Sequence, residues 1–308
     1  MKPKILITDS LFIFPEHEKM LTDAGYEIER LDKPEATEEE LIEAVKGKVG
    51  YILGGTEKFT DKIIDAADSL KAIVFTGIGY KDFIPCYEYV TQKGIAIANT
   101  PDGPTHAVAE WAVTMALAMN RNIFDLGRAG EKKFMTSLGL EGQKIGIIGL
   151  GRIGKEITEM LKPFKTGEIS YYSKNQKDVS GMRYSEMDEL LKESDVIFLC
   201  VSKDAGNDFI DEKQLAQMKD GALLVSFMAE GIVNDQALVS ELKKGRIRAV
   251  SDHPIHDESS KDLPMKTWYC SNGSNAFNTF TELKLTSDMA TKSMLNILQT
   301  GKDKNRVN

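Results

Sequence analysis

The chain has 308 residues, of which 42% are hydrophobic and 28% are charged, and this is the composition of an ordinary globular protein rather than a disordered or collagen-like one. A chain of this length is long enough for two domains that each have a hydrophobic core. Its formal net charge of -8 argues against nucleic acid and against an anionic membrane surface as the main partner.

The first hundred residues alternate short apolar runs with helical patterns. This alternation predicts a parallel sheet with helices on both faces, a flavodoxin-like α/β domain. The expected strands are residues 5–8, 26–31, 51–53, 72–75 and 95–98, and the expected helices are residues 16–24, 38–46, 61–67 and 83–93.

A cluster of turn residues at 99–104 precedes a long helix expected over 105–122. This helix is apolar on nearly every side, which predicts that it lies between two bodies. A second α/β unit and a C-terminal helix over 279–298 follow it. The expected domains are therefore 1–100 plus 279–308, and 101–278. The further strands are expected at 169–172, 196–201, 222–226, 248–251 and 268–270.

The stretch KIGIIGLGRIG at residues 144–154 is typical of a dinucleotide-binding turn, because a buried strand leads through three glycines into a helix. The first glycine permits a tight turn, the second lets the backbone approach a pyrophosphate, and the third lets the helix pack on the sheet. The N-H groups at the start of that helix would face the phosphates. The candidate cofactor residues here are Gly149, Gly151, Arg152, Ile153 and Gly154.

The residue that selects between the two nicotinamide cofactors is expected about 20 residues past the glycines, after the next strand. An acidic residue there would accept both ribose hydroxyls and repel a 2'-phosphate. Ser173 and Lys174 instead offer a hydroxyl and a positive charge. They favour NADP(H), and NAD(H) is the alternative if Lys174 is only a surface residue.

Three cysteines, Cys86, Cys200 and Cys270, share no metal-type spacing and cannot all pair, which indicates a reducing compartment. The apolar run at the N-terminus is too short for a membrane span. We therefore expect a cytoplasmic protein without a membrane partner and without a metal site.

Several stretches together resemble the D-isomer-specific 2-hydroxyacid dehydrogenase family, of the glyoxylate reductase and phosphoglycerate dehydrogenase type. They follow the family's order over nearly the whole chain. The resemblance implies two Rossmann-like or flavodoxin-like, doubly wound parallel-sheet domains with a cleft between them, dimerisation through the cofactor domain, and cofactor contacts from Val201 and Asp252. The similar stretches are Gly77 to Gly79, Gly94 to Pro101, Val108 to Glu110, Gly149 to Gly154, Met218 to Val225, and Asp252.

The catalytic set of that family is an Arg that binds the substrate carboxylate, a His that passes the proton, and a Glu that holds the His. The aligned positions here are Ala229 for the Arg, Asp257 for the Glu, and Gly273, or Ser274 if the register slips, for the His. Neither Ala nor Gly can bind a carboxylate through its side chain or transfer a proton. The resemblance therefore describes a divergent member with an altered active site.

The segment at residues 251–257 holds two of the four histidines of the chain. His253 or His256 is a candidate proton donor, with Asp257 orienting it. The alternative is a polar loop without a catalytic role.

The loop with Gly77 and Gly79 corresponds to the family segment whose backbone N-H groups hold the substrate carboxylate. Lys81 follows this loop and would favour an anion, although a solvated surface lysine is the alternative. A small anionic substrate is expected.

Two functions remain open. The first is an NAD(P)-dependent oxidoreductase acting on the CH-OH or keto group of a small acid. The second is a catalytically inactive NAD(P)-binding sensor or scaffold of the same fold, which signals through its dimer or its domain closure.

Overall fold

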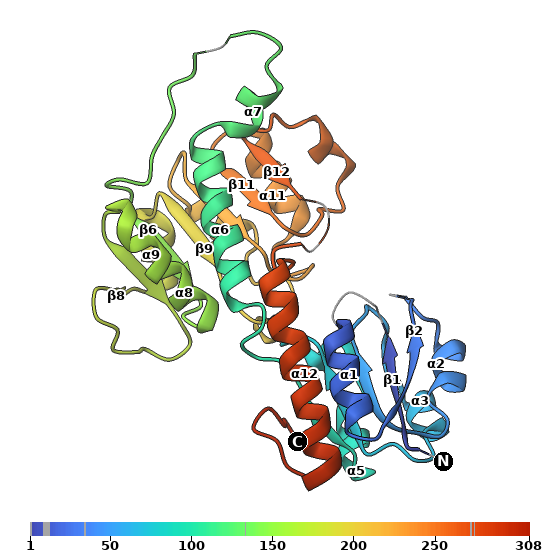
Figure 1. The fold of residues 1–308 in the computed structure, drawn as a ribbon. Helices are drawn as coiled ribbons and strands as arrows, with labels where there is room; N and C mark the ends of the chain where they lie inside the picture. The colour runs from blue at the N-terminus through green and yellow to red at the C-terminus, as the bar shows by residue number, and fades with distance from the viewer. Residues whose placement is uncertain (1, 9–12, 34, 133, 272, 274) are drawn as a thin grey trace. The chain divides into compact units, whose positions relative to one another are not determined.

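The computed structural model describes residues 2–8, 13–33, 35–132, 134–271, 273 and 275–308. The chain forms two compact units, of which the first combines Met1–Pro104 with Asn278–Asn308 and the second is Thr105–Phe277. The sequence analysis placed these divisions after residue 100 and after residue 278. Each unit is built around its own parallel sheet (Figure 1).

Within its described residues the first unit holds a five-stranded sheet with the strand order β2-β1-β3-β4-β5. All neighbouring strands are parallel, so the predicted flavodoxin-like arrangement is confirmed. The strands are β1 (Lys4–Thr8), β2 (Glu27–Leu31), β3 (Lys48–Leu53), β4 (Ala72–Phe75) and β5 (Ala96–Ala98).

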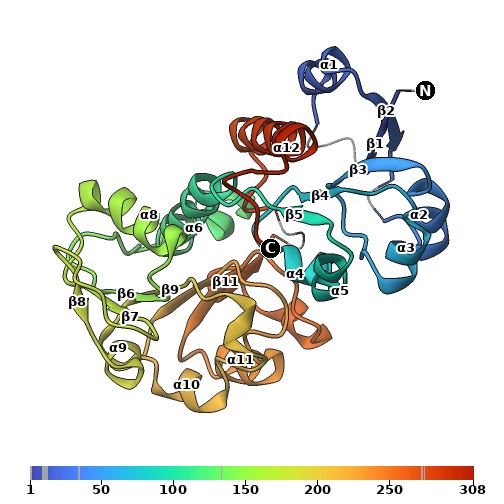
Figure 2. The ribbon, with the colours of Figure 1, turned by 90° about the horizontal axis from the view of Figure 1, so that it is seen from below.

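Helices cover both faces of this sheet because successive side chains of each strand point to opposite sides. Ile5 and Ile7 pack with α1 (Pro15–Asp23) and α12 (Phe280–Thr300), whereas Leu6 belongs to the core under α2 (Glu38–Ala44) and α3 (Asp61–Ala66). Figure 2 shows the two helix layers on either side of the strands. The C-terminal helix therefore completes the fold of the N-terminal unit.

The helix expected over residues 83–93 is two short helices, so that prediction was wrong. They are α4 (Tyr80–Phe83) and α5 (Tyr87–Gln92), and Pro85 lies between them. Proline lacks the N-H that a continuous helix needs, and its ring disfavours a helical conformation at the preceding residue.

The second unit holds, within its described residues, a seven-stranded parallel sheet with the order β12-β11-β10-β9-β6-β7-β8. The strand order reverses between β6 and β9, which makes their carboxyl ends the topological switch point of the sheet. The strands are β6 (Ile145–Ile148), β7 (Ile169–Tyr172), β8 (Arg183–Tyr184), β9 (Val196–Leu199), β10 (Leu223–Ser226), β11 (Arg248–Ser251) and β12 (Trp268–Cys270).

Two helix layers also sandwich this sheet (Figure 2). One layer is α6 (Thr105–Asn120) with α8 (Arg152–Leu161), and the other is α9 (Met187–Glu193), α10 (Glu212–Gln217) and α11 (Asp235–Lys243). The short helix α7 (Ile123–Arg128) follows α6 and leads into an arm at residues 129–143. Among the described residues, no helix has both the length and the apolar character that crossing a membrane requires.

Candidate functional site

The turn after β6 lies at the switch point of the second sheet. Gly149 has a φ of +99°, a conformation that costs little only for glycine. A Cβ atom on this residue would lie 2.5 Å from the carbonyl oxygen of Cys200, at the end of β9. The turn is therefore pressed against the neighbouring strand, as the sequence pattern predicts.

The other two glycines have different roles: Gly154 allows α8 to pack closely on the turn, and Gly151 leaves space open in front of the helix. A Cβ atom on Gly154 would lie 2.5 Å from the carbonyl oxygen of Gly149, so the close approach of α8 to the turn requires glycine. A Cβ atom on Gly151 would meet no atom within 4 Å, so this position opens onto free space in front of the helix.

The first turn of α8 suits a phosphate group. Gly151 is the N-cap, so no side chain caps the helix, and the first turn carries no acidic residue. Its N-H groups and the positive end of the helix dipole therefore face the space that Gly151 leaves open. Arg152 is exposed beside this space and Ile153 is half-buried against the core. These residues fit the pyrophosphate of a dinucleotide.

The carboxyl end of β7 carries the residues expected to select the cofactor. The Ser173 hydroxyl donates to the carbonyl oxygen of Asn175 at 2.6 Å and closes a local turn, while Lys174 is exposed. A residue that the sequence analysis missed lies closer to the glycine turn: the Lys177 ammonium donates to the carbonyl oxygen of Leu150 at 2.5 Å. The sequence offered no clear signal for this contact, since it depends on the path of the loop that follows β7.

Cys200 and Val201, which follow β9, border the glycine turn with their backbone atoms. Burial raises the pKa of the Cys200 thiol well above its usual range, which disfavours the thiolate form that reacts as a nucleophile. Val201 follows it, and its backbone nitrogen would lie 3.0 Å from a Cβ atom on Gly149. Val201 therefore borders the glycine turn, and its contact with a cofactor stays a prediction.

Asp252, at the end of β11, is buried with only 2% of its surface exposed. Its carboxylate accepts hydrogen bonds from the Asn275 and Ala276 backbone N-H groups at 3.0 and 2.8 Å, and from the Ser271 hydroxyl at 2.5 Å. These contacts fix the loop after β12. The structure thus gives this predicted cofactor contact a clear structural role.

A pocket lies at the carboxyl ends of β10 and β11. Ala229 lines it, and so does His253, which is half-buried with its backbone held by the Ser251 hydroxyl. Ala229 contributes no polar side-chain atom to this pocket. It therefore cannot bind a substrate carboxylate, which is the role of the arginine that the family resemblance expects at this position. Residues that contribute to the lining include Met228, Ala229, Glu230, Asp235, His253 and Ile255.

His256 pairs with a different carboxylate from the one expected. Its Nε2 atom lies 3.2 Å from Oε2 of Glu230, and this contact is the main cause that raises the pKa of the imidazole above its ordinary value. Asp257 instead accepts from the Ser259 N-H at 2.9 Å and hydroxyl at 2.5 Å, and so caps the short helix η3 (Glu258–Asp262). These bonds lower the pKa of the Asp257 carboxyl. The expectation that Asp257 orients a histidine is therefore corrected.

Gly273, which the sequence analysis expects at the position of the family's histidine, contributes only backbone atoms. The Gly273 N-H donates to the carbonyl oxygen of Asp252 at 3.3 Å. The alternative position, Ser274, lies outside the described residues. Among the described residues, no group of three His, Cys, Asp or Glu side chains is arranged to hold a metal ion.

In the first unit, the loop after β4 is held through its carbonyl groups. The Gly77 oxygen accepts from the Thr100 N-H at 3.0 Å, and the Ile78 oxygen accepts from the Asn99 side chain at 3.0 Å. Gly79 is the N-cap of α4. The Lys81 ammonium lies 4.9 Å from the ring centroid of Tyr87, in a cation–π contact.

The fold and the glycine turn define a two-unit α/β protein with a dinucleotide-binding sheet. The sequence model described as "D-isomer specific 2-hydroxyacid dehydrogenase, NAD binding domain" matches residues 113–272, within the second unit. The chain belongs to the D-isomer specific 2-hydroxyacid dehydrogenase family. The predicted family is confirmed, and the NAD-binding domain of that family supports a nicotinamide cofactor.

Relatives with known names include the glyoxylate reductase of Thermococcus litoralis, which is 33% identical over 80% of this chain and 78% of that protein. The D-3-phosphoglycerate dehydrogenase of Methanocaldococcus jannaschii is 33% identical over 86% of this chain and 51% of that protein, so the chain spans about half of its length. The solved structure of NAD+-bound 3-phosphoglycerate dehydrogenase from Entamoeba histolytica has the same fold. Its TM-score is 0.85 at 20% identity, with 100% of this chain and 99% of that chain covered.

Proposed function

We propose that this chain is an NAD(P)-dependent oxidoreductase that interconverts the keto and CH-OH groups of a small acid with an altered active site. The observation that carries the proposal is the glycine turn at the switch point, where the uncapped start of α8 faces open space. A bound nicotinamide supplies or accepts the hydride of such a reaction. His253 and His256 are the candidates for moving the proton.

The substrate is a small anion in this proposal. Bonds from Thr100 and Asn99 fix the carbonyl groups of Gly77 and Ile78, and the backbone N-H groups of this loop are the proposed carboxylate-binding side. Lys81 adds positive charge close by, and its contact with the Tyr87 ring limits where that charge can lie.

NADP(H) is the cofactor that the end of β7 favours, with NAD(H) as the alternative. Ser173 and Lys174 carry no negative charge against a 2'-phosphate, and Lys177 brings a second ammonium group to the glycine turn. Replacing Ser173 by Asp should shift the preference toward NADH, because a carboxylate accepts the ribose hydroxyls and repels the phosphate. An unchanged ratio of the two dissociation constants, measured by fluorescence titration, would reject this assignment.

The assembly proposed for the chain is a homodimer formed through the second unit, and its proposed location is the cytoplasm. All three cysteines are free thiols, which suits a reducing compartment. The arm after α7 carries exposed apolar side chains that suit a second copy of the chain.

A second candidate function is a catalytically inactive NAD(P)-binding sensor or scaffold. Its support is the alignment expected from the family resemblance, in which Ala229 and Gly273 take the positions of the family's Arg and His and provide no side chain for chemistry.

The two candidates differ in whether reduced nicotinamide is consumed. The oxidoreductase should consume NADPH, followed by its absorbance, with at least one member of a panel of 2-oxo acids that includes glyoxylate. Tight NADPH binding without consumption by any acid would reject the oxidoreductase and favour the sensor.

A further inference from the structure

We propose that the buried side chain of Tyr171 sets the choice of cofactor by fixing Lys177, whose ammonium group recognises the 2'-phosphate of NADP(H). Tyr171 is a positioning residue in this inference, and Lys177 is the residue that contacts the phosphate. The inference rests on the NADP(H) preference proposed above. It goes beyond that preference because it names the side chains that produce it.

The hydroxyl group of Tyr171 fixes the path of the loop that follows β7. This tyrosine lies within β7, and only 1% of its surface is exposed. Its hydroxyl accepts a hydrogen bond from the Lys177 backbone N-H at 2.9 Å and donates one to the Lys177 carbonyl oxygen. One buried side chain therefore holds both backbone groups of Lys177, and the chain returns to the strand that it left.

Two further contacts limit the freedom of this loop. The ring of Tyr171 packs edge-on against the ring of Tyr184 in β8, with 5.6 Å between the ring centroids, and this contact helps to orient the tyrosine. Within the loop, the Ser173 hydroxyl donates to the carbonyl oxygen of Asn175 at 2.6 Å. The position of the Lys177 backbone is therefore determined by contacts to the sheet and within the loop.

The side chain of Lys177 reaches from this loop to the glycine turn. Its ammonium group donates to the carbonyl oxygen of Leu150 at 2.5 Å, and Leu150 lies between Gly149 and Gly151 in the turn. In dinucleotide-binding sheets, the glycine turn approaches the pyrophosphate and a residue after the second strand contacts the ribose at its 2' position. The ammonium group connects these two regions of the chain, so its positive charge lies where the fold binds the ribose end of the cofactor.

The Leu150 carbonyl oxygen is a neutral acceptor for this ammonium group. A 2'-phosphate is an anionic acceptor, and a hydrogen bond between two charged groups is roughly twice as strong as one between neutral groups. NADPH therefore offers the ammonium group a better acceptor than the carbonyl oxygen. The ribose 2'-hydroxyl of NADH is another neutral acceptor and offers no such gain, so the same lysine favours NADPH over NADH.

The test compares the dissociation constants of NADPH and NADH, measured by fluorescence titration. Calorimetry adds those of adenosine 2',5'-bisphosphate and adenosine 5'-monophosphate, which differ only in the 2'-phosphate. The variants are Lys177→Met, Lys177→Arg, Tyr171→Phe and the double variant Tyr171→Phe with Lys177→Met. Lys219→Met is the matched control, because it removes an ammonium group that donates to Asp195 at 2.6 Å before β9 and β10, at the opposite edge of the sheet from the glycine turn.

Lys177→Met should weaken binding of NADPH and of the bisphosphate by about 10- to 100-fold, the range for a lost hydrogen bond to a charged group. Binding of NADH and of the monophosphate should stay unchanged. Lys177→Arg should keep most of the preference, because a guanidinium also binds phosphate. Tyr171→Phe should weaken NADPH binding by a smaller factor. The double variant should match Lys177→Met alone, because the tyrosine acts through the lysine. Lys219→Met should change none of these constants.

An unchanged ratio of the NADPH and NADH constants in Lys177→Met would overturn the inference while the proposed cofactor preference stands. Equal losses for both cofactors would assign the ammonium group to the pyrophosphate that they share. Tyr171→Phe that leaves NADPH binding intact, or weakens both cofactors alike, would overturn the positioning role of the tyrosine. An unmodified chain that binds NADH as tightly as NADPH would overturn the proposed preference, and the inference with it.

Discussion

The carboxylate of Asp252 joins the end of β11 to the loop that follows β12. Three donors converge on it, namely the backbone N-H groups of Asn275 and Ala276 and the hydroxyl of Ser271. A buried carboxylate needs such partners because an unpaired charge away from water is costly. Asp252 therefore keeps the loop after β12 in place.

Replacing Asp252 by Asn should destabilise the fold. One acceptor oxygen becomes an amide donor that faces another donor, and a buried hydrogen bond lost in this way costs about 1–3 kcal/mol. The midpoint of urea unfolding measures the change. Asp257→Asn, which affects only the cap of η3, should cause a smaller shift. Equal shifts in the two variants would contradict this account of Asp252.

At the residue level, the sequence predicted the glycines but not the partner of His256. The glycine roles depend on neighbours within a few residues along the chain, which a pattern can express. The contact with Glu230 instead depends on the paths of two loops that follow different strands. Asp257 was the expected partner because it aligns with the Glu of the family's catalytic set, yet its carboxylate accepts bonds from Ser259.

Two glycines of the turn between β6 and α8 have different roles, and single substitutions can test each role. Gly154 is needed for packing, and Gly151 keeps open the space that a ligand would enter. Gly154→Ala places a methyl group 2.5 Å from the Gly149 carbonyl oxygen, whereas Gly151→Ala meets no atom within 4 Å. Gly151 also has a φ of -85°, which alanine adopts without strain.

We therefore expect Gly154→Ala to lower the melting temperature. Gly151→Ala should leave it unchanged and still weaken NADPH binding by at least about tenfold, which corresponds to about 1.4 kcal/mol, because its methyl group projects where the pyrophosphate approaches. Calorimetry and fluorescence titration measure the two effects. Unimpaired NADPH binding in Gly151→Ala would show that the dinucleotide does not lie at this turn.

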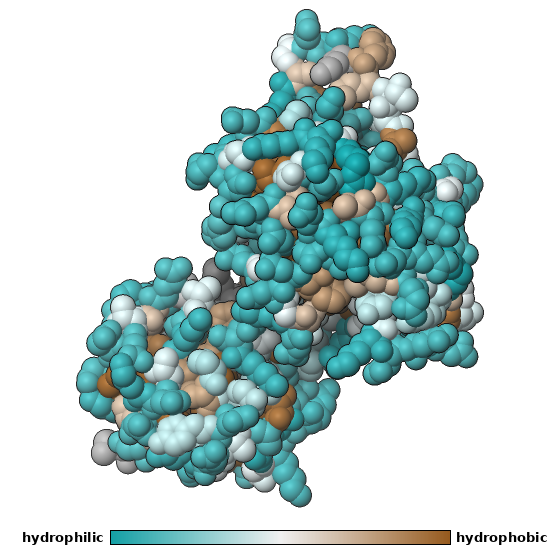
Figure 3. All heavy atoms as spheres, turned by 180° about the vertical axis from the view of Figure 1, so that it is seen from behind, coloured by the Kyte–Doolittle hydropathy of each residue, from teal (hydrophilic) through white to brown (hydrophobic). Residues whose placement is uncertain are grey.

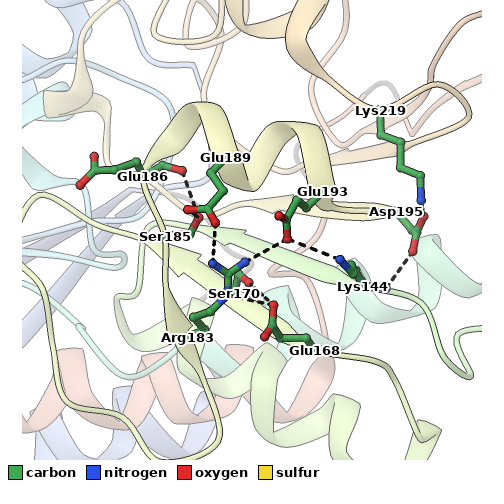
Figure 4. A network of polar contacts seen from close by, with 10 residues as sticks. All are labelled: Lys144, Glu168, Ser170, Arg183, Ser185, Glu186, Glu189, Glu193, Asp195 and Lys219. Carbon is green, nitrogen blue, oxygen red and sulfur yellow. Dashed lines mark hydrogen bonds and ion pairs between the residues drawn. The ribbon is translucent and has the colours of Figure 1, made fainter.

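At the edge of the same sheet, Arg183 holds the short strand β8 through three carboxylates (Figure 4). Its guanidinium nitrogens lie 2.9 Å from Glu168, 2.8 Å from Glu189 and 3.0 Å from Glu193. The sequence analysis missed β8, since two residues give no alternation to detect. β8 pairs with β7 in parallel, and Arg183 also ties it to Glu168, just before β7, and to α9.

Arg183→Met should lower the melting temperature in low salt, because three carboxylates then repel one another without their common cation. The difference should shrink at 1 M salt, where the Debye length is about 3 Å and partly exposed charges are screened. Thermal unfolding followed by circular dichroism at both salt concentrations measures it. A deficit that persists undiminished at high salt would point to lost packing of the arginine stem instead.

At the scale of the molecule, the arm after α7 carries apolar side chains that are exposed among the described residues. On this arm the exposed fractions are 85% for Phe134 and 47% for Leu138, and Ile123 at the start of α7 is 53% exposed. Figure 3 shows apolar side chains around the tip of this arm. Water-exposed apolar side chains gathered on one segment commonly mark an interface.

We expect sedimentation equilibrium to give twice the chain mass of 34.2 kDa. Replacing Phe134 and Leu138 together by Ser should shift the protein toward the monomer, since the buried apolar area of the interface is lost. The melting temperature of the variant at high dilution should match that of the unmodified chain. A monomeric unmodified chain would reject the proposed dimer.

The order of the elements along the chain was largely predictable, because buried parallel strands appear as short apolar runs between helical patterns. The return of α12 to the first unit was anticipated from its length and is borne out by its packing on β3 and β4. The break at Pro85 and the strand β8 were not anticipated, because one depends on a single residue and the other on tertiary contacts. The chemistry was the least predictable part, since it depends on which loop side chains meet.

The most direct test of the account is the fate of the hydride. NADPH that carries deuterium on the transferred position of C4 is incubated with the chain and the best 2-oxo acid, and the product is examined by mass spectrometry and NMR. The account predicts a 2-hydroxy acid that carries one deuterium on the carbinol carbon. NADPH that binds and remains intact, or a product without deuterium on that carbon, would contradict it.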